Sequence, residues 1–197
     1  RTAVKAFHNG SLTDHAWRRK AIPYDEIANS AMVCDPLRKY HFCSPSEGAA
    51  AVVLCRADIA ARYTSSPVTL RADVFRTRLY GSFETLSPAM PVKSAPSPSV
   101  QASKAAFEMA GVGPEDIDVL QVQDTEVGHE IMHLAECGFC KDGEQEALVR
   151  DGATALDGRI PVNTDGGLLA NGEPIGASGL RQVHEVCLQL RGRAGRH

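Results

Sequence analysis

The sequence predicts a layered α/β fold, because segments typical of strands alternate along the chain with segments typical of helices. An uninterrupted apolar run over 49–55 is typical of a strand buried on both faces. Residues 68–74 alternate between apolar and polar types, which is typical of a half-exposed strand. Apolar residues at near-helical spacing predict a helix over 98–110, and an amphipathic helix is predicted over 180–190.

The other elements are predicted from local signals. The first twenty residues mix small, basic and aromatic types without a period, so we expect a loop or arm that packs on another part of the protein. Pro23 opens a short helix over 24–29, whose acidic first turn suits the helix dipole. We also expect a short helix over 57–62, a proline- and serine-rich surface loop over 87–98, a strand over 119–122, and helices near 127–136 and 144–150.

Composition places the chain among globular proteins. Its 197 residues are enough to bury a core. Of these residues, 43% are hydrophobic and 23% charged, which is typical of a globular protein. The net charge of −3, from 21 basic and 24 acidic residues, argues against a dedicated nucleic-acid or polybasic membrane-binding protein. No apolar run approaches the ~20 residues that span a bilayer. We therefore expect neither nucleic acid nor a membrane span among its partners.

Several of the six cysteines lie in apolar surroundings, where cysteine behaves as a small hydrophobic residue. The chain is also large for a scaffold that depends on disulfides. We therefore expect reduced thiols and a cytoplasmic protein. The six are Cys34, Cys43, Cys55, Cys137, Cys140 and Cys187.

Residues 129–133 match the HExxH pattern of zinc peptidases. On a helix, His129 and His133 share a face and are placed to bind zinc, with Glu130 as the base. The nearby Cys137 and Cys140 form a CxxC pattern that also allows a redox interpretation. The alternative is an ordinary helix followed by its C-terminal turn. A zinc hydrolase is thus one hypothesis to test, although we expect no metal.

The glycine-rich segment over 163–179 is the most informative part of the sequence. Its glycines allow tight turns and a close backbone approach to a ligand. It leads into a helix, whose free N–H groups can stabilise an anion or oxyanion. Glu173 stands between Gly172 and Pro174, where a turn would hold its carboxylate in place. The alternative is a surface loop with a solvated glutamate.

Polar residues follow the predicted strand over 119–122. Gln123 and Asp124 come where that strand ends and a helix begins, which is where α/β folds place their chemistry. Asp124 or Thr125 is equally suited to cap the helix. The two interpretations are compatible, so this stretch alone does not choose between them.

With these motifs in place, the sequence resembles the thiolase superfamily, and in particular its sterol carrier protein x and nonspecific lipid-transfer branch. The resemblance runs nearly end to end. Its most specific part is the glycine motif, together with the order of the segments on either side. The segments that carry it are Val4-Lys5 with His8-Asn9-Gly10, Asp35-Pro36-Leu37, Cys43 to Ala51, Asn163 to Gly179, and Val186 to Gly195.

The resemblance implies a layered α/β sandwich of two similar halves, in proteins about twice as long as this chain. It implies that 1–63 form the end of the N-terminal half and 64–197 the C-terminal domain. The chain begins at Arg1 rather than Met, so we expect a C-terminal piece of a longer polypeptide, inactive alone. Family members also imply a homodimer and, for some, a small OB-fold partner protein.

The resemblance also implies a site, with departures from the family pattern. The family's catalytic histidine corresponds to Glu173, and the first residue of its HDCF or NEAF stretch corresponds to Gln123. A carboxylate suits proton abstraction better than the binding of a thioester oxygen, which needs a hydrogen-bond donor. The expected catalytic residues are Glu173, Gln123 and Asp124, and the expected substrate-binding residues are Gly167, Gly172, Gly176 and Ser178.

The function implied is the cleavage or formation of carbon–carbon bonds in acyl-CoA thioesters, by an acyltransferase or an aldolase. Some lipid-transfer relatives act as aldolases on steroid side-chain CoA thioesters, so retro-aldol cleavage of a steroid or lipid side-chain CoA ester is one form of it. The coenzyme A thioester is the substrate, and no further cofactor is expected. The alternative is a catalytically degenerate subunit that binds acyl-CoA or lipid, or scaffolds a partner.

Overall fold

The computed structural model describes residues 1–78 and 96–197. Residues 87–95 of the loop expected over 87–98 lie outside the described residues. The elements are α1 (Thr2–Gly10), α2 (Tyr24–Ala28), β1 (Met32–Cys34), β2 (Leu37–Arg38), α3 (Pro98–Ala110), α4 (Val127–Glu136), α5 (Gln145–Arg150), α6 (Gly167–Asn171) and α7 (Ser178–Leu190), with 3-10 turns at η1 (Lys39–His41), η2 (Ala57–Arg62) and η3 (Pro114–Asp116).

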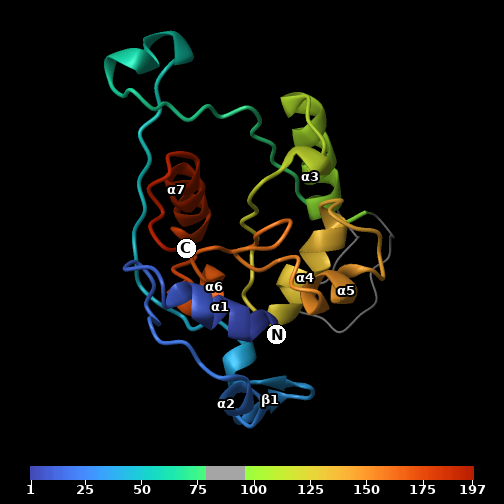
Figure 1. Ribbon diagram of the computed structural model, residues 1–197. Helices are drawn as coiled ribbons and strands as arrows, with labels where there is room; N and C mark the ends of the chain where they lie inside the picture. Colours follow the sequence, from blue (N-terminus) through green and yellow to red (C-terminus); the bar gives the residue numbers. More distant parts are fainter. Residues whose placement is uncertain (79–95) are drawn as a thin grey trace.

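The first core cluster packs α1 against α6, as Figure 1 shows at the base of α7. Ala3, Ala6 and Phe7 share one face of α1 and pack in this cluster with Leu169 and Ala170. The expectation of an irregular arm is therefore wrong for the first ten residues. Small and aromatic residues at i, i+3 and i+4 spacing are sufficient to make a helix when a partner covers them.

A second core cluster joins α4 to the segment that precedes the candidate site. Val122, Leu134 and Val162 are its buried members. Leu120 forms a parallel bridge with Val162, and the Leu120 N–H donates to the Pro161 carbonyl at 2.9 Å. The strand expected over 119–122 is thus an extended segment with a single bridge.

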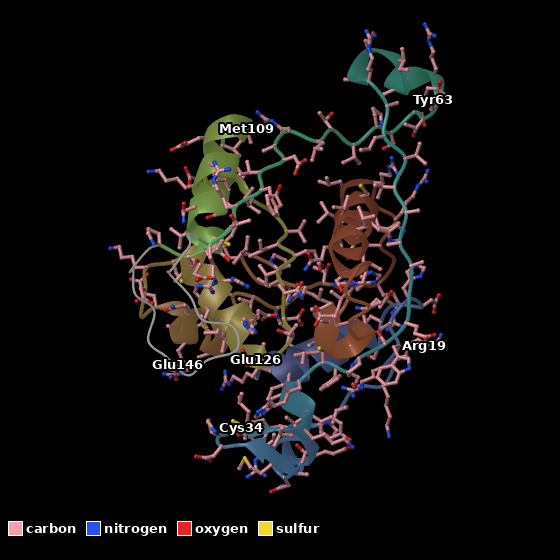
Figure 2. The ribbon with its side chains drawn as sticks, turned by 180° about the vertical axis from the view of Figure 1, so that it is seen from behind. Arg19, Cys34, Tyr63, Met109, Glu126 and Glu146 are labelled. Carbon is pink, nitrogen blue, oxygen red and sulfur yellow. The ribbon has the colours of Figure 1, made fainter. Side chains whose placement is uncertain are left out.

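The segment over 49–75 extends away from the body of the protein. Figure 1 shows it rising to the 3-10 turn η2, and Figure 2 places Tyr63 at its far tip. The strands expected over 49–55 and 68–74 are wrong for this structure, because Val53 is 99% exposed and Leu54 76%. A buried strand needs neighbours for its backbone groups, and within the described ranges no strand lies beside this segment.

The helical predictions agree better with the structure. The helices expected over 24–29, 98–110, 127–136 and 144–150 are confirmed as α2, α3, α4 and α5, and α7 begins two residues before the expected position 180. Within the described part of the chain, the sheet structure is the β1–β2 antiparallel hairpin and isolated bridges. No helix of the described chain is both long and apolar enough to pass through a bilayer.

Candidate active site

Two distant segments run side by side at Glu173. Its backbone N–H donates to the Ser44 carbonyl at 2.9 Å, and Glu173 forms a parallel bridge with Pro45. Gly172 makes this approach possible, because its φ of +73° is left-handed and a Cβ there would collide with Ser46. The glycine before Glu173 therefore fixes the direction in which the carboxylate leaves the chain.

The Glu173 carboxylate receives hydrogen bonds from two side chains. The Gln123 amide Nε2 donates to Oε1 at 2.5 Å, and the Cys43 thiol donates to Oε2 at 3.7 Å. All three residues are half-buried, so they remain within reach of a ligand. We call Cys43, Gln123 and Glu173 the Glu173 cluster. It brings together two of the residues expected from the sequence and one that sequence reasoning missed.

Extended backbone presents Gln123 to the cluster. Residues 122–125 alternate between buried and half-buried, so the Gln123 side chain points to the opposite side from its two neighbours. The Val122 N–H donates to Asn163 Oδ1 at 3.0 Å. The Cys43 N–H donates to the Thr125 carbonyl at 2.9 Å, which places Cys43 beside the same segment. Main-chain contacts thus position both donors to Glu173.

The cluster raises the pKa of the Cys43 thiol to about 11. Partial burial is the largest cause, followed by the negative charge of Glu173 and the hydrogen bond to it. Asp124 adds to the effect and Arg18 opposes it. At neutral pH the thiol is therefore protonated, and it acts as a hydrogen-bond donor rather than as a thiolate nucleophile.

Asp124 points away from the cluster. It is completely buried, and its carboxylate accepts from the backbone N–H groups of Leu168 at 2.7 Å and Leu169 at 3.4 Å. Burial and the nearby charge of Glu130 raise its pKa well above the usual value. In the structure Asp124 therefore holds the start of α6, and its expected role beside the substrate stays a prediction.

The four residues expected to bind substrate are not brought together. Gly167 lies against the Asp124 carboxylate, where a Cβ would collide, and Gly172 is buried against Ser46. Ser178 is buried and donates to the Pro174 carbonyl at 3.4 Å. Gly176 is exposed with open space around it. Of these positions, Gly172 adjoins the Glu173 cluster.

Arg18 ties the Cys43 segment to α6. Its guanidinium Nη2 donates to Ser44 Oγ at 2.5 Å, and its backbone N–H donates to the Ala170 carbonyl at 2.8 Å. The guanidinium also lies over the Trp17 ring, 5.1 Å from its centroid. Arg18 therefore fixes Ser44, whose carbonyl accepts from the Glu173 N–H.

A cavity of about 780 Å³ adjoins the cluster. Pro45, Ser46 and Pro174 line it, so the segments that carry Cys43 and Glu173 continue directly into its wall. The rest of the lining includes His15, Trp17, Asn171, Arg181 and His184. Cys43, Gln123 and Glu173 are not themselves part of this lining, so the cluster meets the cavity through its neighbours in the chain. The space is large enough for a small-molecule ligand.

The HExxH motif lies on α4 but does not form a zinc site. Glu130 is completely buried, and its carboxylate accepts from Lys5 Nζ at 2.6 Å and from Asn163 Nδ2 at 2.9 Å. We call Lys5, Glu130 and Asn163 the Lys5 network. His129 and His133 pair instead with the glutamates Glu126 and Glu136, respectively, of the same helical region. In the part of the chain that the structure describes, no three His, Cys, Asp or Glu side chains form a metal-binding group.

All six cysteines carry free thiols. Cys43 is the functional candidate that sequence reasoning missed. Its local pattern gave no catalytic signal. The segment 43–51 is nevertheless among those that resemble the thiolase superfamily, and this resemblance is the signal that could have identified Cys43.

Comparisons with known proteins identify the family of this chain. A sequence model of the thiolase C-terminal domain-like family matches residues 88–197. The acetyl-CoA acetyltransferase of Methanothermobacter thermautotrophicus is 40% identical over 95% of this chain and 48% of its own length. Human sterol carrier protein 2 is 35% identical over 87% of this chain and 31% of its own. This chain therefore spans less than half the length of each of these relatives.

A solved structure has the same fold. The Ltp2-ChsH2(DUF35) aldolase aligns with a TM-score of 0.80 over 98% of this chain and 50% of that one, at 19% identity. A likeness at that identity establishes a thiolase-like α/β fold and no shared activity. On the family match and its relatives, the chain belongs to the thiolase superfamily, and its residues 88–197 match the C-terminal domain of that family.

Proposed function

We propose that the protein acts on acyl-CoA thioesters and cleaves or forms a carbon–carbon bond. The names of its relatives support this class of substrate, since they include an acetyl-CoA acetyltransferase and an aldolase. Because this chain spans about half the length of those two, the proposal concerns the full-length protein. The proposed cofactor requirement is none beyond the coenzyme A thioester itself.

The observation that carries the proposal is the half-buried carboxylate of the Glu173 cluster. Glu173 receives an amide hydrogen bond and a thiol hydrogen bond, and no cation neutralises it through either contact. A carboxylate held in this way beside a cavity is suited to act as a general base. Gln123 orients Oε1, so that Oε2 faces Cys43.

We propose retro-aldol cleavage of a 3-hydroxyacyl-CoA as the reaction. Glu173 removes the proton of the β-hydroxyl group, and the oxygen forms a carbonyl as the bond between Cα and Cβ breaks. The bond electrons pass to the thioester as an enolate, and protonation of Cα completes a shortened acyl-CoA. The proposed substrates carry a steroid or lipid side chain on the β carbon.

The proposed assembly follows from the resemblance. Residues 1–63 would end one half of a layered sandwich and 64–197 would form the second half, in a cytoplasmic homodimer with a small OB-fold partner. The solved neighbour's name joins two components, Ltp2 and ChsH2, which supports a partner for this chain. Light scattering after gel filtration of the full-length protein tests the dimer, and a monomer mass would remove it from the proposal.

The test is a Glu173→Gln variant of the full-length protein, with 3-hydroxybutyryl-CoA as probe. Wild-type protein should release acetaldehyde and acetyl-CoA, and the variant should lose at least ~100-fold in kcat, the usual contribution of a general base. Glu108→Gln is the matched control, because Glu108 is exposed on α3. Cleavage at the wild-type rate by the Glu173 variant would remove Glu173 from the mechanism.

A second candidate is a non-catalytic subunit that binds acyl-CoA or lipid. The presence of Glu173 at the position of the family's catalytic histidine favours it, and the Cys43 thiol, with a pKa of about 11, is a poor nucleophile for thiolase chemistry at neutral pH. This candidate predicts that the full-length protein binds 3-hydroxybutyryl-CoA in calorimetry and cleaves none of it. Any turnover above the Glu173→Gln background would exclude it.

A further inference from the structure

The retro-aldol proposal leaves one proton unassigned. After the Cα–Cβ bond breaks, the enolate carbon must be protonated, and Glu173 has just received the hydroxyl proton on the other side of the reacting bond. A neutral carboxamide is not a useful acid, so Gln123 cannot supply this proton. The cluster holds one other group with an acidic hydrogen, the thiol of Cys43.

We infer that Cys43 is a catalytic acid, which delivers a proton to the α carbon of the shortened acyl-CoA and recovers it from Glu173. The inference rests on the proposed function and deepens it. It assigns a chemical role to a side chain that neither the family match nor the relatives' names mention.

Geometry places the thiol where such a relay needs it. Cys43 Sγ lies 3.7 Å from Glu173 Oε2, a distance at which a thiol donates to a carboxylate. Gln123 occupies the other carboxylate oxygen, Oε1. The two donors therefore do not compete, and a proton on Oε2 is adjacent to the sulfur.

The backbone holds the thiol in this position from two sides. The Cys43 N–H is bonded to the Thr125 carbonyl at 2.9 Å, and the next residue, Ser44, is bonded to Arg18 and to the Glu173 N–H. Cys43 is also half-buried, so it is held firmly and remains reachable. The segment continues at Pro45 into the wall of the adjoining cavity, from which an acyl group would approach.

The proton balance closes without a further reactant. The hydroxyl proton passes to Glu173 as the carbonyl forms, and the electrons of the Cα–Cβ bond pass to the enolate. The S–H bond of Cys43 breaks as the new C–H bond forms, which leaves a thiolate beside a protonated carboxyl group. That carboxyl group returns its proton to the thiolate, and both residues regain their starting state.

The electrostatics favour this direction. The pKa of Cys43, raised to about 11, keeps the thiol protonated at neutral pH, so the acid is ready when the enolate appears. The same shift makes the thiolate a stronger base than an ordinary one, which favours recovery of the proton from Glu173. Burial is the largest cause of the raised pKa, and it remains after Glu173 has taken up the hydroxyl proton and lost its charge.

The experiment compares Cys43→Ala, Cys43→Ser and Glu173→Gln in the full-length protein. Two rates are measured: cleavage of 3-hydroxybutyryl-CoA, and incorporation of deuterium from D₂O into the methyl group of acetyl-CoA offered alone. We expect Cys43→Ala to lose about 100-fold in both rates, the usual share of a positioned acid or base. Cys137→Ala is the control. The pKa of the Cys137 thiol is also raised to about 11, and that residue lies at the end of α4.

The outcomes separate this inference from the proposed function. If Glu173→Gln is inactive while Cys43→Ala and Cys43→Ser both stay within twofold of wild type in cleavage and exchange, Cys43 is not the acid and the proposed function stands. If none of the three variants changes either rate, both fail. Should Cys43→Ala unfold, as judged by circular dichroism, Cys43→Ser decides, because it keeps the size of the side chain with a far weaker acid. Full exchange in a folded Cys43→Ser would overturn the inference.

Discussion

The Glu173 cluster and the Lys5 network are two versions of the same contact, an amide donating to a glutamate carboxylate. In the network, Asn163 donates to a carboxylate that is completely buried and also paired with Lys5. In the cluster, Gln123 donates to a carboxylate that is half-buried and has a thiol as its second partner. The difference lies in burial and in the charge of the second donor.

This difference separates a structural carboxylate from the one that we propose to act in the reaction. A buried glutamate with an ammonium partner serves the fold, since removal of the partner leaves an uncompensated charge away from water. A half-exposed glutamate with two neutral partners is instead open to solvent and within reach of a ligand. The HExxH motif was a candidate catalytic feature from the sequence, yet its Glu130 belongs to the structural version.

Removing the cation from the Lys5 network should have the largest effect on stability. Lys5→Met leaves Glu130 buried without its charged partner, which costs about 3–5 kcal/mol in the free energy of unfolding. Urea unfolding of the full-length protein measures it, with Lys104→Met on the exposed face of α3 as the control. If Lys5→Met lowers the free energy of unfolding by less than Lys104→Met does, the Lys5 network does not stabilise the fold.

The raised pKa of Asp124 predicts a particular pH dependence. A carboxyl whose pKa is higher in the folded state stabilises the fold fully below its ordinary pKa of 3.8, and this contribution is lost as pH rises through the raised value. The uncharged Asp124→Asn variant lacks this loss. Its stability relative to wild type should therefore improve from pH 4 to pH 8, by about 1.4 kcal/mol for each unit of pKa elevation.

Urea unfolding at several pH values measures this trend for the Asp124→Asn variant. Asp116→Asn serves as the control, since Asp116 is exposed in η3. The opposite trend is a rise in the unfolding free energy of wild-type protein relative to the Asp124→Asn variant as pH rises. It would show that the folded state does not raise the pKa of Asp124, and would contradict this account of the residue.

The contact between Cys43 and Glu173 predicts a smaller, local effect on thiol reactivity. Glu173→Gln removes the charge that raises the pKa of Cys43, so the thiolate fraction at pH 8.5 rises and alkylation by iodoacetamide speeds up several-fold. Burial remains, so the pKa should stay above 9.0. Cys137 provides an internal control, because its shift arises from burial and Glu136. Equal acceleration at both cysteines, read by peptide mass mapping, would argue for general loosening.

Replacing a histidine of α4 should have the smallest effect on the free energy of unfolding. Replacing His133 by alanine removes a partly exposed contact with Glu136 on the same helical turn, worth about 0.5 kcal/mol or less. Thermal unfolding with and without added zinc measures this change. A rise in the melting temperature with zinc that is lost in His133→Ala would revive the metal interpretation.

Much of the fold could be predicted because its helices depend on local patterns. Ser97 caps the start of α3, where its side chain accepts from the Val100 N–H at 3.3 Å, and the left-handed Gly111 follows its last residue. Both boundaries of α3 can therefore be predicted from local residue types. The apolar run over 49–55 shows the limit, since composition alone cannot tell whether a partner strand exists. α1 was missed for the opposite reason, because its helix depends on the distant α6.

The candidate site could be predicted in part for the same reason. Glu173 was identified from its glycine turn and Gln123 from its place after an extended segment, both local signals. That the two meet is a fact of tertiary structure, and so is the arrival of Cys43 from 130 positions away in the sequence. Asp124 stands next to Gln123, but the pleat of the chain turns it to the opposite side.

The most direct test of the account is the position of a bound substrate. A crystal structure of the full-length Glu173→Gln variant with 3-hydroxybutyryl-CoA would trap the complex before cleavage. The account predicts the β-hydroxyl oxygen within about 3 Å of the side chain at position 173, in reach for proton transfer, with Cα facing the sulfur of Cys43. An acyl group bound elsewhere, with the side chain at 173 facing solvent, would contradict it.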